Sequence, residues 1–599
     1  MIRSVNPATG EQLAAFDPDS AQSIDERLTT ATVAQARWRQ TPVGERTELL
    51  SRLASTLRER SGELALLIIQ EMGKPLTEAL AEIEKCAVTC EYYAANAIGF
   101  LADEPVRSTA SQSRIVYDPL GVVLAVMPWN YPFWQFFRFA APALAAGNGI
   151  VLKHANSVPQ CALAIAAVLH AAGTPEGLVQ VLLVETRQVA TLIADDRIAA
   201  VTFTGSTEVG TIIAAQAGAA LKKQVLELGG SDPFVVLADA DVQAAAETAV
   251  RARFVNVGQS CVNAKRFIVE QAVADEFVDA FCAATDRLVV GDPLDTTTTI
   301  GPLARADLRD TLHDQTRRSV EAGAKPLRGG EPVDRPGYYY QPTVLDHVVP
   351  GMAAFDEETF GPLAAITRAA DAADAIRLAN LTEFGLGAAL WTGDPERAER
   401  YSRELAAGAV FVNGMVASDA RLPFGGIKRS GYGRELGPHG MREFMNTKTV
   451  WVGPATAPES ECLVVRPDQV ELFDRGNGVV TTPYVGSWNS AHNTVTTGTT
   501  TFAVGTQIPL HSHNVEESVL IVRGSAVAVI GGDRVELRAG DATWVPAGVP
   551  HHFVNVGDDE LVIYWVYGGR AVTRTLTETG VTVAHLSDRD RGAVATASK

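Results

Sequence analysis

The sequence predicts a large α/β region followed by a separate all-β domain. A chain of 599 residues is too long for one hydrophobic core, so roughly two to four domains are expected. Short apolar runs such as GVVLAVMPW and AAVTFTGS alternate with Ala-rich helical stretches, which predicts a parallel sheet covered by helices. After residue 461 the pattern changes to short strands rich in Thr and Val and separated by Gly turns, which is typical of a β-sandwich or barrel.

The α/β region begins with helices and continues with two strand–helix series. Over residues 20–99 the apolar residues recur with helical spacing, and Gly73, followed by Pro75, is expected to close one helix. The first series follows, and the second begins at KQVLELGGSDPFVVLADAD and runs past GAVFVNG.

The stretch GPATAPESE, rich in Pro, Ala and Ser, breaks all periodicity and is interpreted as an interdomain linker. The end of the chain, RDRGAVATASK, has little to bury and is expected to be flexible. The predicted divisions are a first domain with the N-terminal helices (1–227), a second α/β domain (228–420), a return to the first (421–453), the linker (454–461), the β domain (462–575) and a flexible tail (576–599).

Composition excludes several classes of function. The formal net charge of -19 argues against a nucleic-acid surface, so a small molecule is the expected partner. The N-terminus has no apolar signal-peptide core, and no stretch approaches eighteen uninterrupted apolar residues, which predicts neither export nor a membrane span. Six cysteines without a C-x-x-C pair fit a reducing cytoplasm.

Three separated residues could form one catalytic site. Cys261 lies among small and polar residues in NVGQSCVNAKRF; a lone cysteine is usually structural, so other stretches must decide its role. Asn130 sits in an aromatic, Pro-bounded turn after a predicted strand, in VMPWNYPFW. Glu227 ends a predicted strand next to a Gly pair in VLELGGSDP, where a carboxylate would be placed over a cleft.

From Asn6 to about Val452 the chain resembles the NAD(P)-dependent aldehyde dehydrogenase superfamily. The blocks VLELGGSDPFVVL, GQSCVNAKRFIV, DEETFGPL and LPFGGIKRSGYGRELG carry the resemblance, and MPWNYPFWQ and LKHANSVPQCAL look most like bacterial succinate-semialdehyde dehydrogenases. The resemblance implies a Rossmann-like cofactor domain and an α/β catalytic domain. It also implies that Cys261 attacks an aldehyde, that Asn130 and the Cys261 backbone N–H hold the oxyanion, and that Glu227 is the general base.

A nicotinamide cofactor, NADP or NAD, follows from the same resemblance. The stretch FTGSTEVG leads from a strand into a helix, where backbone N–H groups face a pyrophosphate, although alone it is a weak motif. Where NAD-preferring members often carry a glutamate, this chain has Asn156, which predicts that NADP is accepted. The other cofactor-binding residues that the resemblance implies are Trp129, Lys153, Gly205, Ser206, Leu228, Glu358 and Phe360.

The substrate is less closely defined. Arg138 resembles in position an arginine that binds the distal carboxylate of succinate semialdehyde in some relatives, and its alternative role is a salt bridge on a helix surface. A second arginine that such enzymes place before the cysteine has no clear match, because Arg253 is two residues out of step.

The all-β domain carries a second set of candidate ligands. His511 and His513 have strand spacing, Glu517 shares their parity whereas Glu516 does not, and His551 follows a Pro-x-Gly turn. The segments GTQIPLHSHNVEESVLIVRG and GDATWVPAGVPHHFVN resemble the two cupin motifs. The resemblance implies a cupin barrel that holds a divalent transition metal (Fe, Mn, Ni, Cu or Zn).

Three hypotheses therefore stand for the whole chain. The first is an aldehyde dehydrogenase with a metal-binding cupin. The second makes the cupin the principal enzyme, a dioxygenase or isomerase, with the dehydrogenase clearing its product. In the third the cupin is a ligand sensor or an assembly module. Because QSRIVYDPLGVVLAV and REFMNTKTVWVG resemble the strands that the family uses for subunit contacts, a homodimer or homotetramer is expected.

Overall fold

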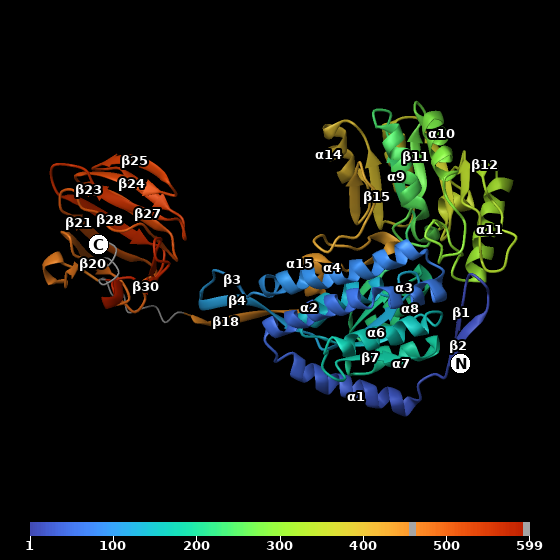
Figure 1. The fold of residues 1–599 in the computed structure, drawn as a ribbon, viewed down its shortest axis with the longest axis horizontal. Coiled ribbons are helices and arrows are strands. Elements are labelled where there is room, and N and C mark those ends of the chain that lie inside the picture. Colours follow the sequence, from blue (N-terminus) through green and yellow to red (C-terminus); the bar gives the residue numbers. More distant parts are fainter. Residues whose placement is uncertain (455–462, 591–599) are drawn as a thin grey trace. The chain divides into compact units, whose positions relative to one another are not determined.

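The computed structural model describes residues 1–454 and 463–590 and divides the chain into two compact units (Figure 1). The first comprises Met1–Arg107 and Gln112–Trp451, and the second takes Ser108–Ser111 and the chain from Val452 onward. The predicted linker, 454–461, lies almost wholly outside the described residues. None of the helices among the described residues has both the length and the apolar composition needed to cross a membrane.

The first sheet of the first unit places the cofactor residues at one edge. Its strand order is β17-β9-β8-β5-β6-β7, all parallel except β17, so the order reverses between β5 and β8. At such a switch point the carboxyl ends of two neighbouring strands open a crevice for a ligand. The strands are β5 (Val122–Met127), β6 (Gly149–His154), β7 (Val179–Leu182), β8 (Ile198–Thr204), β9 (Lys223–Glu227) and β17 (Gly431–Tyr432).

Helices pack on both faces of this sheet, as the alternating pattern predicts (Figure 1). Gly73 does close α3: its φ is +79°, and a Cβ there would come within 2.6 Å of the Pro302 ring. The helices are α1 (Ala21–Trp38), α2 (Val43–Glu59), α3 (Ser61–Met72), α4 (Leu76–Phe100), α5 (Trp134–Ala146), α6 (Pro159–Ala171), α7 (Val189–Ala194) and α8 (Thr207–Ala219).

The second sheet has the order β12-β13-β14-β11-β10-β15-β16 and is parallel except for β12. Its central strands β10 and β11 are buried along their whole length, which explains their continuous apolar runs. The strands are β10 (Asp232–Val236), β11 (Ala264–Glu270), β12 (Lys325–Arg328), β13 (Thr343–Asp346), β14 (Leu363–Ala369), β15 (Gly387–Trp391) and β16 (Ala409–Val412). The helices are α9 (Val242–Phe254), α10 (Ala274–Thr285), α11 (Ala306–Glu321), α12 (Ala353–Asp356), α13 (Ala372–Asn380) and α14 (Pro395–Glu404).

Two small sheets complete this part of the chain. Strands β1 (Ile2–Val5) and β2 (Gln12–Phe16) form a hairpin. After α15 (Gly437–Glu443), β18 (Met445–Pro454) joins β4 (Ala110–Pro119) and β3 (Glu104–Pro105) in the order β18-β4-β3. Trp451 of β18 is half exposed beside this sheet edge. The homodimer or homotetramer stays a prediction.

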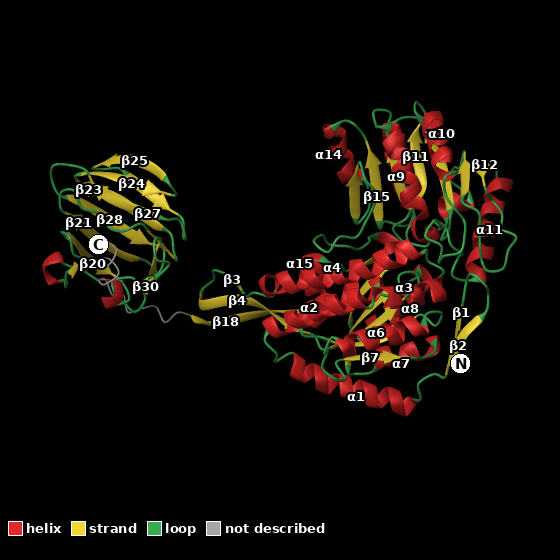
Figure 2. Cartoon of the chain, in the orientation of Figure 1, coloured by secondary structure: helices red, strands yellow, loops and turns green. Residues whose placement is uncertain are grey.

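The second unit is built from two six-stranded antiparallel sheets whose inner faces form one core (Figure 2). Strand β28 shows the expected alternation, every second residue being buried. One sheet has the order β19 (Phe473–Asp474), β20 (Val479–Val485), β21 (Thr496–Phe502), β28 (Leu561–Tyr567), β23 (Glu517–Arg523), β26 (Ala542–Val545). The other has the order β25 (Asp533–Arg538), β24 (Ser525–Ile530), β27 (His551–Asn555), β22 (His511–His513), β29 (Thr573–Leu576), β30 (Thr582–Ala584).

The expectation of a flexible tail over 576–599 is wrong for its first part. Strand β30 pairs with β29, and Asp590 is fully buried in ion pairs with Arg475 and Arg574. The polar sequence of this segment gives no sign of burial, because its anchor is a charge that neutralises buried arginines rather than an apolar side chain. Residues 591–599 lie outside the described residues.

Candidate active site

Cys261 lies at the end of a loop with an unusual backbone. Asn256, Val257 and Gly258 have consecutive left-handed conformations, with φ of 56°, 57° and 72°. The Asn256 amide N–H donates to Glu78 Oε2 at 2.8 Å, and its side-chain Nδ2 donates to the Asn130 carbonyl at 2.9 Å. Together these bonds hold the loop against α4 and the turn after β5.

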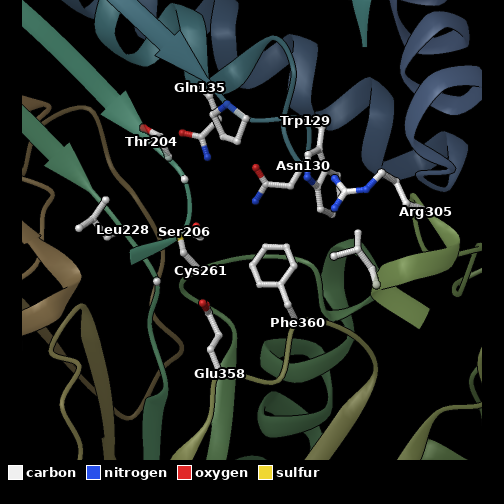
Figure 3. A pocket seen from close by; sticks show the side chains of 14 residues that line it. Trp129, Asn130, Gln135, Thr204, Ser206, Leu228, Cys261, Arg305, Glu358 and Phe360 are labelled. Carbon is white, nitrogen blue, oxygen red and sulfur yellow. The ribbon is translucent and has the colours of Figure 1, made fainter. Parts of the chain in front are cut away.

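Two cavities meet at Cys261. The cofactor-side cavity opens at the ends of β5 and β8, and Figure 3 shows how its side chains surround the space next to Cys261. Its lining residues are Pro128, Trp129, Asn130, Gln135, Thr204, Gly205, Ser206, Leu228, Gly229, Cys261, Arg305, Leu308, Glu358 and Phe360. The second cavity, here called the substrate-side cavity, is lined by Lys85, Tyr131, Trp134, Gln135, Arg138, Val255, Ser260, Cys261, Val262, Asn263, Met415, Val416, Ala417, Ser418 and Phe424.

The cofactor-side cavity has the aromatic and polar character of a nucleotide site. Trp129 and Phe360 pack edge to face with centroids 5.8 Å apart, and the Arg305 guanidinium lies 5.6 Å from the Trp129 ring. Ser206 caps the N-terminus of α8 by accepting from the Val209 N–H. The buried Thr204 hydroxyl lines the cavity and has no hydrogen-bond partner in the described part of the chain, so a ligand there would satisfy it.

Of the remaining predicted cofactor residues, Glu358 lines this cavity, whereas Lys153 and Asn156 do not. Glu358 accepts from the Gly230 N–H at 3.0 Å and pairs with Lys265, whose Nζ also donates to the Cys261 carbonyl at 2.8 Å. Lys153 is the second-last residue of β6 and donates to Asn156 Oδ1 at 3.2 Å; neither Lys153 nor Asn156 lines the cavity itself. Burial lowers the pKa of Lys153 to about 8.

Asn130 and Cys261 both face the cofactor-side cavity (Figure 3). One hydrogen of the Asn130 amide goes to the Gln259 carbonyl at 3.0 Å, which leaves the second for another acceptor. Burial raises the pKa of the Cys261 thiol to about 11, although Arg138 and Lys265 act in the opposite direction. Without a ligand, the neutral thiol is therefore the favoured form.

Glu227 ends β9 but lines neither cavity. Its carboxylate is buried beside the turn at Gly425, where an added Cβ would lie 2.7 Å from Oε1, and neither oxygen has a hydrogen-bond partner among the described residues. Burial and the nearby Glu435 carboxylate raise the pKa of Glu227 well above its usual value. This environment favours the protonated acid.

The substrate-side cavity contains two cationic side chains, Lys85 and Arg138. Arg138 pairs with Glu435 and is only 2% exposed, so the salt bridge of the structural alternative is present, but it is buried rather than on a helix surface. Lys85 donates to Ser418 Oγ at 2.7 Å and lies 4.3 Å from the Trp134 ring centroid. The sequence reasoning missed Lys85, because the helical periodicity of α4 suggested packing alone.

Arg253 lies in neither cavity. It is fully buried and donates to the Ala264 and Thr359 carbonyls at 3.2 and 3.1 Å. Arg253 therefore supports the backbone around the cysteine loop. Because it lies outside both cavities, it does not replace the substrate-binding arginine that some relatives have before the cysteine.

In the second unit, His511, His513 and His551 come together in the barrel interior. Each Nδ1 is bound to a backbone carbonyl, those of Pro509, Thr573 and Val549 respectively, at 2.7–2.9 Å. A neutral imidazole that donates from Nδ1 has a bare lone pair on Nε2. The Nε2 atoms of His511 and His513 are 3.1 Å apart, and the ligand atoms of all three lie within 4.8 Å of one another.

A carboxylate completes this cluster. Glu517 Oε2 lies 2.6 Å from His551 Nε2 and is buried, whereas Glu516 is exposed and accepts from Trp544 Nε1, as strand parity predicts. Converging lone pairs and a carboxylate repel one another unless a cation or a proton lies between them. The residues present therefore fit a divalent transition metal.

Comparison with known proteins decides the family. The model of the aldehyde dehydrogenase family matches residues 1–450. The chain belongs to that family. A cupin domain model matches residues 498–567, so both resemblances seen in the sequence are confirmed.

The relatives of the dehydrogenase portion bear names that agree with each other. A probable succinate-semialdehyde dehydrogenase [NADP(+)] of Synechocystis is 50% identical over 451 residues, covering 75% of this chain and 99% of that protein. The Escherichia coli succinate semialdehyde dehydrogenase [NAD(P)+] Sad is also 50% identical, over 448 residues, with coverages of 75% and 97%. The succinic semialdehyde dehydrogenase structure from Streptococcus pyogenes with NADP+ is 35% identical with a TM-score of 0.74, covering 76% of this chain and all of that one. The chain is thus an NAD(P)-dependent aldehyde dehydrogenase with a C-terminal cupin domain.

Proposed function

We propose that the dehydrogenase portion oxidises succinate semialdehyde, or a similarly short aldehyde with a distal carboxylate. The observation that carries this proposal is the half-buried Lys85 in the substrate-side cavity. Arg138 lines the same cavity, but Glu435 already neutralises it. Among the described residues, Lys85 contacts the neutral Ser418 hydroxyl and the Trp134 ring, and the Glu82 and Asp419 carboxylates act on it without a direct ion pair. Its charge is therefore available to a carboxylate in the cavity. The names of the relatives support the same substrate.

The reaction begins at Cys261. Once the Cys261 thiol has given its proton to water, the thiolate adds to the aldehyde carbon and forms a thiohemiacetal, whose oxyanion accepts from the second Asn130 amide hydrogen and from the Cys261 backbone N–H. When bound, NAD(P)+ supplies the hydride acceptor. Loss of a hydride from the thiohemiacetal leaves a thioester on Cys261, and attack by water releases the carboxylic acid and regenerates the thiolate.

Glu227 would take the proton from that water. For this role its carboxylate has to give up its own proton and turn from the Gly425 side towards Cys261, since it lines neither cavity in the present conformation.

The cofactor-side cavity fits NADP, and the fit rests on unsatisfied polar groups. The Thr204 hydroxyl and the N-terminus of α8 at Ser206 would face the pyrophosphate. Among the described residues, the hydrogen-bond partner of Lys153 is the neutral amide of Asn156, so a 2'-phosphate would be attracted by the lysine and not repelled by a carboxylate at position 156.

The cupin domain would hold one divalent transition metal through His511, His513, Glu517 and His551. Its support is the set of three Nε2 lone pairs that the carbonyls of Pro509, Thr573 and Val549 fix towards one point. A site with three imidazoles and one carboxylate suits Fe, Mn, Ni, Cu or Zn. When bound, the metal supplies a Lewis acid or redox centre in the barrel.

The first prediction separates the nucleophile from the base. Cys261→Ala should lower aldehyde oxidation at least about 1,000-fold while cofactor binding, measured by calorimetry, stays nearly unchanged, because only the covalent step is lost. Glu227→Gln should instead give a burst of reduced cofactor followed by a slow steady rate, because the thioester forms but is not hydrolysed.

Cys282→Ala on α10, outside both cavities, is the matched control and should leave the activity unchanged. Turnover in Cys261→Ala would overturn the mechanism, and a missing burst in Glu227→Gln would assign the base to another residue.

The second prediction concerns substrate charge. Lys85→Met keeps the length of the side chain and removes its charge, so kcat/KM for succinate semialdehyde should fall roughly 10- to 100-fold. Butanal, which lacks the carboxylate, should be affected little. Burial lowers the pKa of Lys85 to about 8, and a lysine loses its charge above its pKa. The KM for succinate semialdehyde should therefore rise as the pH passes above about 8, whereas the KM for butanal should not.

Lys325→Met on the exposed edge strand β12 serves as the control. Equal losses for the two aldehydes in Lys85→Met would show that Lys85 supports only the fold of the cavity.

The third prediction concerns the choice of cofactor. Asn156→Glu should lower the ratio of kcat/KM with NADP to kcat/KM with NAD at least about tenfold, because a carboxylate beside Lys153 repels a 2'-phosphate. Asn156→Gln keeps the neutral amide and should preserve the ratio. A wild-type enzyme whose kcat/KM is a hundredfold lower with NADP than with NAD would contradict the proposal.

The fourth prediction concerns the metal. Purified protein should carry about one divalent transition metal per chain by elemental analysis, and the double variant His511→Ala/His513→Ala should lose it. Equal metal contents would refute the site. Since neither Cys261 nor Glu227 needs a metal, chelation should leave aldehyde oxidation intact; a parallel loss of activity would instead couple the cupin to the dehydrogenase as a sensor or assembly module.

A further inference from the structure

Two arginines lie inside the cupin barrel, next to the histidine cluster. Arg475 and Arg574 are only 3% and 2% exposed. Arg574 pairs directly with His513 across strands β22 and β29, so both side chains share the inner face. One cavity is lined by Arg475, Thr500, Ile508, His511, Glu517, His551, Phe553, Ile563, Trp565, Tyr567, Arg574 and His585.

Asp590 bridges the two arginines. Its Oδ2 accepts from Arg475 Nη1 and its Oδ1 accepts from Arg574 Nη1, each at 2.9 Å. The Leu586 amide N–H also donates to Oδ2, at 3.0 Å. A carboxylate is thus already held in the position where two guanidinium groups converge.

Polar groups around this carboxylate remain unsatisfied. Arg574 Nε and both ring nitrogens of His585 are buried without a hydrogen-bond partner in the described part of the chain. His585 lies in the cavity wall against Tyr567, with ring centroids 4.9 Å apart. Unsatisfied buried donors are costly, so these groups point to a ligand that is larger than the Asp590 carboxylate alone.

The charges in this cavity balance without a metal. The two guanidinium groups are matched by two carboxylates, Asp590 and Glu517, and the imidazoles are neutral in the arrangement described above. A free carboxylate that took the place of Asp590 would therefore keep this balance. A planar guanidinium pair matches a carboxylate group in shape as well as in charge.

The segment that carries Asp590 has few other anchors. Between Leu586 and Asp590 only the Asp590 side chain is fully buried, and Asp588 and Arg589 are exposed. Besides the packing of Leu586 against the barrel core, its attachment rests on the ion pairs with Arg475 and Arg574, which a free carboxylate could replace one for one.

We propose that the cupin cavity binds a small organic carboxylate, whose carboxylate group takes the position of Asp590 between Arg475 and Arg574 and releases the segment Leu586–Asp590. The cavity itself, about 10 Å³, has room for about one water molecule, so the rest of the ligand would lie beside His585 in the space that the released segment leaves. The site is independent of the proposed substrate of the dehydrogenase. Asp590 acts in this proposal as an internal competitor that closes the cavity when the ligand is absent.

Binding of succinate to the full-length protein, measured by calorimetry, tests the proposal. Asp590→Ala removes the competitor, so succinate should bind at least tenfold more tightly than to wild type, and adding Arg574→Gln should abolish that gain. Asp588→Ala, an exposed neighbour in the same segment, is the matched control and should bind as wild type does. Because succinate is also the acid expected from the dehydrogenase, only binding that Asp590→Ala strengthens and Arg574→Gln removes is assigned to the cupin.

A second measurement uses wild-type protein and does not depend on the folding of any variant. Hydrogen exchange should become faster at the Leu586 amide in saturating succinate, because that amide loses its Asp590 acceptor, and uncharged succinamide should have no such effect. If Asp590→Ala does not fold, Asp590→Asn, which keeps the volume and removes the charge, should show the same gain in affinity.

Three results would overturn the proposal. Equal affinities for wild type and the Asp590 variants, together with unchanged exchange at Leu586, would make Asp590 a purely structural ion-pair partner. Faster exchange with succinamide would show that charge is not what is recognised. Inorganic phosphate that binds as tightly as succinate would replace the carboxylate assignment by a general anion site.

Discussion

The left-handed backbone of Asn256–Gly258 is the constraint on which the dehydrogenase site depends. A β-branched residue such as Val257 at a positive φ costs on the order of 1–3 kcal/mol. That cost is offset by bonds from the loop to Glu78 and to the Asn130 carbonyl, and by Lys265, which holds the Cys261 carbonyl. Because the loop is fixed from three sides, Cys261 stands where the two cavities meet, and aldehyde and hydride acceptor can approach it from different directions.

Burial decides the resting charge of the two central groups. It raises the pKa of Cys261 to about 11 and that of Glu227 well above its usual value, so the ligand-free site favours a thiol and a carboxylic acid. Arg138 acts against both shifts, and its pairing with Glu435 limits how far it does so. A positive charge that approached the thiol would lower its pKa and favour the thiolate.

The parts that the sequence predicts well are those with a local pattern or a long family block. The parallel sheets follow from apolar runs such as β10, and Cys261 and Asn130 follow from blocks that include their neighbours. Lys85 was missed because its role depends on Ser418, more than 300 positions away, while its own helix reads as ordinary packing. Asp590 was missed because the low hydropathy of its segment predicts a flexible tail. Its burial depends on ion pairs with distant arginines, and such pairs leave no periodic pattern of apolar residues in the sequence.

Arg138 in the dehydrogenase and the Arg475–Arg574 pair in the cupin have a feature in common but differ in how firmly their partners are held. Each is a buried guanidinium that a carboxylate from a distant part of the chain neutralises. The backbone of Glu435 pairs with Phe424 in both directions and its side chain is buried, so this segment is held by more than the ion pair. Asp590 lies in a segment whose side chains are otherwise half or fully exposed. The partner of Arg138 therefore belongs to a firmly anchored segment, whereas the Arg475–Arg574 pair can exchange its carboxylate for one that arrives from solution.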